Sequence, residues 1–89
     1  MLTNRRECRD DGSMVQVVIR EVPEAIPPCT HRYKYRLAFV VDGACVVRYD
    51  NERGKGDHRH FRQSETPYRF STPERLIEDF MNDVTRWER

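Results

Sequence analysis

Hydrophobic and polar residues alternate over several short stretches of the chain, a pattern typical of strands with one buried face. Residues 14–22 are rich in β-branched side chains and predict a strand. Residues 2–9 are expected to pair with it, which gives an N-terminal hairpin over 2–22. Three prolines within residues 23–30 end this hairpin, because proline cannot donate to a sheet ladder, and they predict a loop.

The clearest strand covers residues 33–41, and Asp42-Gly43 after it predicts the turn of a central hairpin over 31–50. The two faces of this strand differ in character, because successive side chains point to opposite sides. The face expected to join the core carries Tyr33, Tyr35, Leu37, Phe39 and Val41, and the opposite, basic face carries Arg32, Lys34, Arg36 and Ala38.

The hydrophobic pattern also predicts how the two strands of this hairpin pair. A two-residue loop would place Leu37 opposite Arg48, which sets a core residue beside a charge. A three-residue loop over 41–43 places Leu37 opposite Val47 and puts Gly43 at the left-handed position that such loops favour. We therefore expect the three-residue loop.

A helix is predicted near the C-terminus, over residues 73–88. Ser71 and Glu74 fit a capping box, and Pro73 fits the first helical turn. The apolar residues that follow recur at helical spacing and form one stripe: Leu76, Ile77, Phe80, Val84 and Trp87. We expect this stripe to cover the apolar face of the sheet.

These elements predict a single α+β domain over residues 1–89, in which a small antiparallel sheet of about four to five strands carries the C-terminal helix on one face. Residues 68–70 are a candidate for a short final strand. Hydrophobic residues make up 37% of the chain and charged residues 35%, so the core must be thin. No apolar run approaches the roughly 20 residues that span a bilayer, and no signal peptide is visible, so we expect a cytoplasmic protein without membrane contact.

Charge is distributed unevenly, although the net charge is only +1. Residues 31–62 contain eight Lys or Arg against four Asp or Glu, whereas the rest of the chain is acidic. The expected register also leaves Arg36 and Arg48 side by side, and like charges opposite each other are destabilising. A protein that keeps such a pair can use it to hold an anion. The middle of the chain is therefore expected to carry an anion-binding face.

Residues 51–60 contain two glycines and no apolar side chain, and they predict a charged loop. Within it, Asp57, His58 and His60 are candidates for chemistry. They fit a metal site, a general acid/base pair for RNA cleavage, or a loop that only binds phosphate. A solvated charged loop without a function is the simplest alternative, because a short His-x-His pattern is a weak signal.

The surrounding charges favour one of these alternatives. Three cations, Arg53, Lys55 and Arg59, oppose the binding of a divalent ion, so we expect no metal at His58 or His60 and no other cofactor. The same cations suit a phosphate, whose developing negative charge they would stabilise during cleavage.

Three segments resemble the TumE family of small bacterial toxins: HRYKYRLA at 31–38, RYDNERGKGDHRH at 48–60 and PYRF at 67–70. The similarity extends over residues 14–85, nearly the whole chain. The resemblance implies the toxin half of a type II toxin–antitoxin pair, encoded beside a helix-turn-helix antitoxin. It also implies endonuclease action on RNA.

The residues and the resemblance together predict an endoribonuclease that cleaves RNA by metal-independent general acid/base chemistry. Asp57 would orient a histidine, while His58 and His60 would exchange protons with the RNA. The alternative from another class is a non-catalytic nucleic-acid- or protein-binding module, which would lack the bell-shaped pH profile of cleavage that two histidines give. Phosphate would be bound by five basic side chains: Arg36, Arg48, Arg53, Lys55 and Arg59.

Overall fold

The computed structural model describes residues 3–88, which form six strands and one helix. This confirms the predicted α+β fold, with six strands in place of the expected four to five. In chain order the elements are β1 (Thr3–Cys8), β2 (Met14–Glu21), β3 (Tyr33–Val41), β4 (Ala44–Glu52), β5 (Gly56–Phe61), β6 (Ser64–Pro67) and α1 (Pro73–Glu88).

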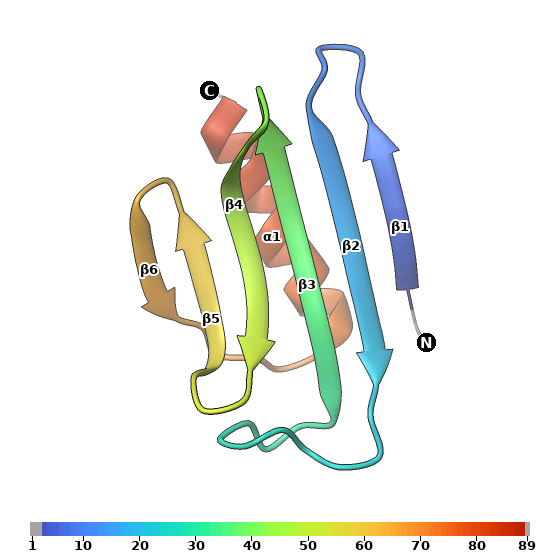
Figure 1. Ribbon diagram of the computed structural model, residues 1–89, viewed down its shortest axis with the longest axis vertical. Coiled ribbons are helices and arrows are strands. Elements are labelled where there is room, and N and C mark those ends of the chain that lie inside the picture. The colour runs from blue at the N-terminus through green and yellow to red at the C-terminus, as the bar shows by residue number, and fades with distance from the viewer. Residues whose placement is uncertain (1–2, 89) are drawn as a thin grey trace.

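The strands form one antiparallel sheet in which each strand pairs with its neighbour in the chain, so the spatial order is β1 to β6. Helix α1 lies behind β3 and β4 and contacts both (Figure 1). We call the side that carries the helix the helix face and the opposite side the open face. Within residues 3–88, no helix combines the length and the apolar character that crossing a bilayer requires.

The core lies between the helix and the middle of the sheet. Leu37 and Phe39 on β3 are 0% and 1% exposed, which confirms the predicted core face of this strand. From the helix, Leu76, Phe80 and Val84 are buried against them, as the helical spacing predicts. Near the end of the helix, Trp87 packs edge-on against Phe39, with 5.8 Å between ring centroids.

The N-terminal hairpin forms between β1 and β2, where Cys8 pairs with Met14 across a short turn. Leu2, at the start of the expected hairpin, lies outside the described residues. The Pro-rich segment 23–30 forms a loop between β2 and β3. Its Pro27 carbonyl accepts a hydrogen bond from the Gly54 N–H at 2.9 Å, so this loop also supports the turn that follows β4.

The turn between β3 and β4 corrects the prediction of a three-residue loop. Val41 pairs with Ala44, so the loop has two residues, Asp42 and Gly43. Both have positive φ angles, 51° and 79°, which is the type I′ geometry whose twist suits a tight hairpin.

A bulge in β4 removes the conflict that made the two-residue loop look unfavourable. Val40 pairs with Cys45 but Phe39 pairs with Val47, so β4 contains one extra residue between these pairs. Leu37 consequently lies opposite Tyr49, and core residues face core residues. The expected side-by-side placement of Arg36 and Arg48 is also wrong, because Arg36 lies opposite Asp50.

Residues 51–60 do not form the expected loop. Strand β4 continues to Glu52 and β5 begins at Gly56, so only residues 53–55 form a turn. The strand was hidden in the sequence because both faces of β5 carry polar side chains. The polar side chains on the helix face find partners in distant parts of the chain: Asp57 bonds His31 and Tyr35, while Arg59 bonds Asp83.

The last strand and the start of the helix also differ from their predicted positions. Strand β6 covers Ser64–Pro67, whereas residues 68–70 lead to the helix and pack their aromatic rings against the core. Thr72, and not the expected Ser71, caps the helix, because its Oγ1 accepts a hydrogen bond from the Arg75 N–H at 3.1 Å. Pro73 explains this start, since a residue before proline favours the extended conformation of an N-cap.

Candidate functional site

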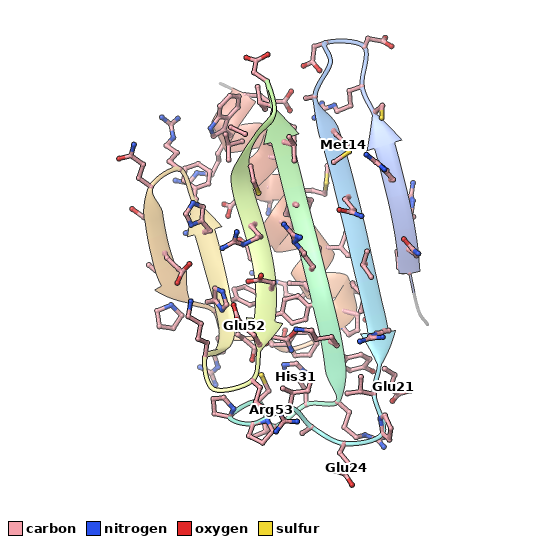
Figure 2. All side chains as sticks on the ribbon, in the orientation of Figure 1. Met14, Glu21, Glu24, His31, Glu52 and Arg53 are labelled. Carbon is pink, nitrogen blue, oxygen red and sulfur yellow. The ribbon has the colours of Figure 1, made fainter. Side chains whose placement is uncertain are left out.

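Polar side chains gather on the open face where β4, β5 and β6 lie side by side. Alternate residues of a strand share a face, and the register places His60 opposite Arg48 and His58 opposite Asp50. Figure 2 shows Glu52 at the end of β4 and Arg53 in the turn beyond it. We call this group the polar cluster; it consists of Arg48, Asp50, Glu52, His58, His60 and Glu65.

His58 lies between two carboxylates at one end of the polar cluster. Its Nε2 is 2.7 Å from Asp50 Oδ1 and 3.9 Å from Glu52 Oε1. The opposite ring nitrogen, Nδ1, donates a hydrogen bond to the Gly56 carbonyl at 3.2 Å. The second oxygen of Asp50, Oδ2, lies 3.5 Å from Arg48 Nε, so this carboxylate lies between an imidazole and a guanidinium.

Glu65 gathers the groups at the other end of the polar cluster. One of its oxygens lies 3.9 Å from His60 Nδ1 and 3.7 Å from Arg48, and the other lies 3.7 Å from Lys55 Nζ. The side chain of His60 is 26% exposed, whereas that of His58 is 7% exposed. A bound molecule can therefore reach His60 directly, while His58 is covered.

The polar cluster contains a concentration of buried polar atoms that lack hydrogen bonds. Within the described part of the chain, no partner is found for Arg48 Nε, Asp50 Oδ1, His58 Nε2 or His60 Nδ1. Asp50 Oδ1 and His58 Nε2 lie 2.7 Å apart, but this contact does not meet the geometry of a hydrogen bond. Native proteins pair nearly all such atoms, so a group of four in one place indicates a functional site.

Two further residues that were predicted to bind phosphate, Arg36 and Arg53, lie beside the polar cluster. Arg36 on β3 is exposed and lies opposite Asp50 in the register. Arg53 is exposed in the turn between β4 and β5. Lys34, on the same face of β3 as Arg36, donates to the Asn51 carbonyl. The structure therefore brings Arg36, Arg48 and Lys55 near the histidines.

Arg59 lies on the helix face, away from His58 and His60. Its Nε and Nη2 donate to the two oxygens of Asp83 on α1 at 2.5 and 3.0 Å, and its Nε also donates to the Tyr49 hydroxyl at 3.0 Å. The bond to Asp83 raises the pKa of Arg59 further above its usual value. This guanidinium joins the sheet to the helix.

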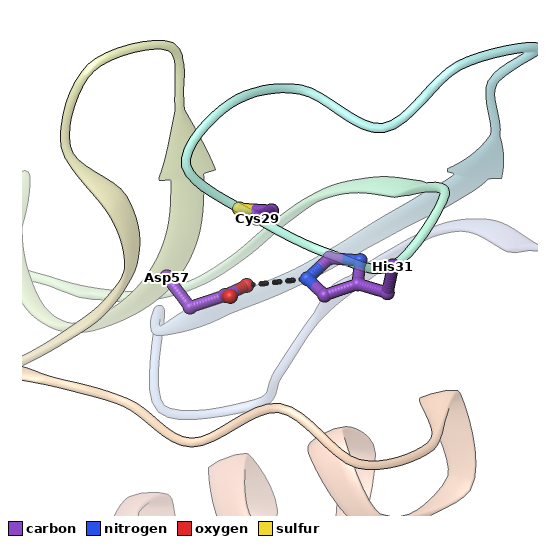
Figure 3. Close-up of side chains that lie close together, drawn as sticks. All are labelled: Cys29, His31 and Asp57. Carbon is purple, nitrogen blue, oxygen red and sulfur yellow. Dashed lines mark hydrogen bonds and ion pairs between the residues drawn. The ribbon is translucent and has the colours of Figure 1, made fainter.

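Asp57 also lies on the helix face and bonds a histidine other than the two that were expected. Its Oδ1 accepts hydrogen bonds from His31 Nε2 at 2.8 Å and from the Tyr35 hydroxyl at 2.6 Å. Figure 3 shows His31 and Asp57 together with Cys29 of the Pro-rich loop. His31 and Asp57 are 26 positions apart in the sequence, so no local spacing points to their contact.

This second group has the geometry of a structural cross-link. The Tyr33 N–H donates to His31 Nδ1 at 3.2 Å, so the ring proton is on Nε2 and is donated to Asp57. Burial, and then the charge of Asp57, raises the pKa of the Cys29 thiol, which disfavours a reactive thiolate. The His31 ring packs on Phe70, with 3.9 Å between centroids. The group ties the Pro-rich loop to β3 and β5.

Comparison with known protein families gives one match. A family model described as Toxin TumE matches residues 2–88, nearly the whole chain. Comparisons with curated proteins and with solved structures gave no match.

Proposed function

The chain belongs to the TumE toxin family, and from this premise we propose that it acts as an endoribonuclease whose RNA-binding surface is the open face of the sheet. The observation that carries the proposal is the polar cluster, with its two histidines, its arginine and its four buried atoms without hydrogen bonds among residues 3–88. These atoms contact oppositely charged groups of the cluster without hydrogen-bonding them, so a charged ligand can compete for them.

The basic side chains around the polar cluster suit the RNA backbone. Arg36, Arg48 and Lys55 approach it from β3, from β4 and from the turn before β5. The Lys55 side chain is 58% exposed and the Arg48 side chain 30%, so both can contact a phosphate. A phosphate would take the place of Glu65 as their counter-ion. Such contacts position a nucleic acid without reading its sequence.

His60 is the histidine that RNA can contact. In this proposal it takes the proton from a ribose 2′-hydroxyl, whose oxygen then attacks the adjacent phosphorus atom. The bond from phosphorus to the 5′-oxygen breaks, and that oxygen leaves with a proton from solvent. Arg48 and Lys55 stabilise the charge that builds up on the phosphate. The side chain of His58 is only 7% exposed, so it does not touch the RNA in this proposal.

The family also supports a partner. We propose that a helix-turn-helix antitoxin, encoded beside this chain, binds the toxin and neutralises it. Expression of the chain alone should arrest bacterial growth, and co-expression of the neighbouring reading frame should restore it. Growth that the chain does not affect at any expression level would contradict the toxin proposal for this chain.

Cleavage of RNA by purified protein tests the enzymatic part. Removing a general acid or base costs about 10²- to 10⁴-fold in rate, so His60→Ala should lose about that much cleavage. A histidine that is partly exposed contributes little to stability, so the thermal midpoint of this variant should change little. A folded His60→Ala variant that cleaves at the original rate would contradict the role of His60.

A matched pair of lysine and arginine variants tests the binding surface. Lys55→Ala should weaken RNA binding and reduce its dependence on salt, because one phosphate contact is lost. Arg32→Ala is the control, since Arg32 is equally exposed but lies beside Glu21 at the end of β2, outside the polar cluster. Wild-type protein that binds RNA and never cleaves it would instead support the non-catalytic binding module.

A further inference from the structure

We propose that Asp50, Glu52 and His58 form a binding site for a divalent metal ion of the Mn²⁺ or Zn²⁺ type. One potential ligand atom from each of these residues lies within 4.8 Å of the other two. Two carboxylates and one imidazole are a ligand set that first-row divalent ions accept. The two carboxylates together also carry the charge that balances such an ion.

The orientation of the His58 ring is the main observation behind this inference. Because Nδ1 donates its proton to the Gly56 carbonyl, Nε2 is the ring nitrogen through which His58 would bind a metal ion. This nitrogen is buried and faces Asp50 Oδ1 at 2.7 Å and Glu52 Oε1 at 3.9 Å, and among the residues that the structure describes no contact of it has hydrogen-bond geometry. A ring held by a backbone carbonyl through its second nitrogen is the usual arrangement of a metal-binding histidine.

The two carboxylates complete the ligand set from the same strand. Asp50 and Glu52 are two residues apart on β4, so both point to the open face. Asp50 directs Oδ1 toward His58 and Oδ2 toward Arg48, which leaves the guanidinium outside the ligand set as a support for the carboxylate. The Glu52 side chain is 53% exposed and can turn toward an ion.

Of the three cations that opposed a metal in the sequence, one lies on the other face of the sheet, one is paired with a carboxylate and one is exposed to solvent. Arg59 is on the helix face and is paired with Asp83. Lys55 is paired with Glu65, and Arg53 is exposed in the turn. The ligands also differ from those considered in the sequence, because Asp57 lies on the helix face and His60 lies near Glu65. The objection is therefore weaker for the site formed by Asp50, Glu52 and His58.

The other cluster of possible metal ligands, Cys29, His31 and Asp57, is less suitable. The proton of His31 is on Nε2, the nitrogen that faces Asp57, because Nδ1 accepts from the Tyr33 N–H. A metal ion at Nε2 would require the ring proton to move to Nδ1. There it would face the Tyr33 N–H, which is also a donor. We therefore expect an ion to bind at Asp50, Glu52 and His58, and not at Cys29, His31 and Asp57.

Binding of Mn²⁺ to the purified protein tests the inference by isothermal titration calorimetry. We expect one ion per chain, and Glu52→Gln should weaken binding about tenfold or more, because one charged ligand is lost. Asp50→Asn should weaken it further. The readout is cation binding by the protein alone, so the inference stands or falls independently of RNA cleavage.

Two variants serve as controls. Glu65→Gln removes a carboxylate of the polar cluster outside the proposed ligand set, and Cys29→Ser disables the other cluster; both should bind Mn²⁺ as the original chain does. Since Glu52 is exposed, Glu52→Gln is expected to remain folded even if Asp50→Asn does not. Absence of binding by Mn²⁺ and by Zn²⁺, or binding that Glu52→Gln leaves unchanged, would overturn the proposal.

Discussion

At the scale of single residues, Asn51 shows how one side chain can replace part of a sheet ladder. It is 1% exposed, and its Oδ1 accepts a hydrogen bond from the Tyr35 N–H at 3.1 Å while its Nδ2 donates to the Tyr33 carbonyl at 2.7 Å. The last backbone pair between β3 and β4 at this end joins Arg36 and Asp50. Asn51 therefore continues the connection where backbone pairing stops.

Replacing this asparagine by alanine should strongly destabilise the protein. Asn51→Ala leaves the buried N–H of Tyr35 and the partly buried carbonyl of Tyr33 without their partners, and each such loss costs about 1–3 kcal/mol. We expect a loss of about 2–4 kcal/mol in the free energy of unfolding, measured by chemical denaturation. Asn82→Ala on the exposed helix surface is the control and should change it by less than about 0.5 kcal/mol. Equal effects of the two substitutions would show that the Asn51 bridge contributes nothing.

At the scale of elements, Asp83 joins α1 to β4 and β5. It is 4% exposed and bonds both Arg59 and the Tyr49 hydroxyl, the latter at 2.6 Å. Breaking a buried ion pair leaves one charge without compensation. The helix is thus held by a polar contact as well as by its apolar stripe.

Arg59→Ala tests this connection. It should destabilise the fold toward the lower end of about 3–5 kcal/mol, because Asp83 stays buried while Arg59 itself is partly exposed. The control, Arg75→Ala, removes an arginine that forms an exposed ion pair with Asp79 and should cost at most about 1 kcal/mol. Thermal and chemical unfolding of both variants gives the comparison. If the two variants are equally stable, the contact of Arg59 with Asp83 has no special role.

At the scale of the whole molecule, two buried tyrosines and a partly buried one predict how the protein responds to alkaline pH. Burial raises the pKa of Tyr35, Tyr49 and Tyr68, and hydrogen bonds to Asp57, Asp83 and Asp79 raise the three values further. In the unfolded chain a tyrosine ionises near pH 10. The folded state keeps the three hydroxyls protonated, so its stability is fully present below about pH 10 and is lost progressively above it.

Tyrosinate absorbance and circular dichroism, recorded together during an alkaline titration, measure this effect. Ionisation of these three tyrosines should accompany unfolding, so the two signals should change together above about pH 10. The chain has four tyrosines. Ionisation of more than one of them while the circular dichroism stays native would contradict the prediction.

The central strand, the N-terminal hairpin and the helix could be predicted because their patterns are local. Residues 33–41 alternate between core and solvent, and the stripe from Leu76 to Val84 repeats at helical spacing. The register between β3 and β4 could not be predicted in the same way. It depends on a bulge in β4. The position of a bulge depends on how both strands pack on the helix, and the sequence pattern of one strand does not show this.

The sequence by itself determined the α+β class, the core face of β3 and the position of the helix, because apolar periodicity dictates which side of an element is buried. It also placed His58 and His60 among the candidate residues. Only the tertiary structure decided which charged groups meet. Asp50 and Glu52 approach His58, while Asp57 and Arg59 turn to the helix face, because residues one position apart on a strand point to opposite sides. In residues 56–61 this alternation could not be predicted, because the polar composition of the segment gave no sign of a strand.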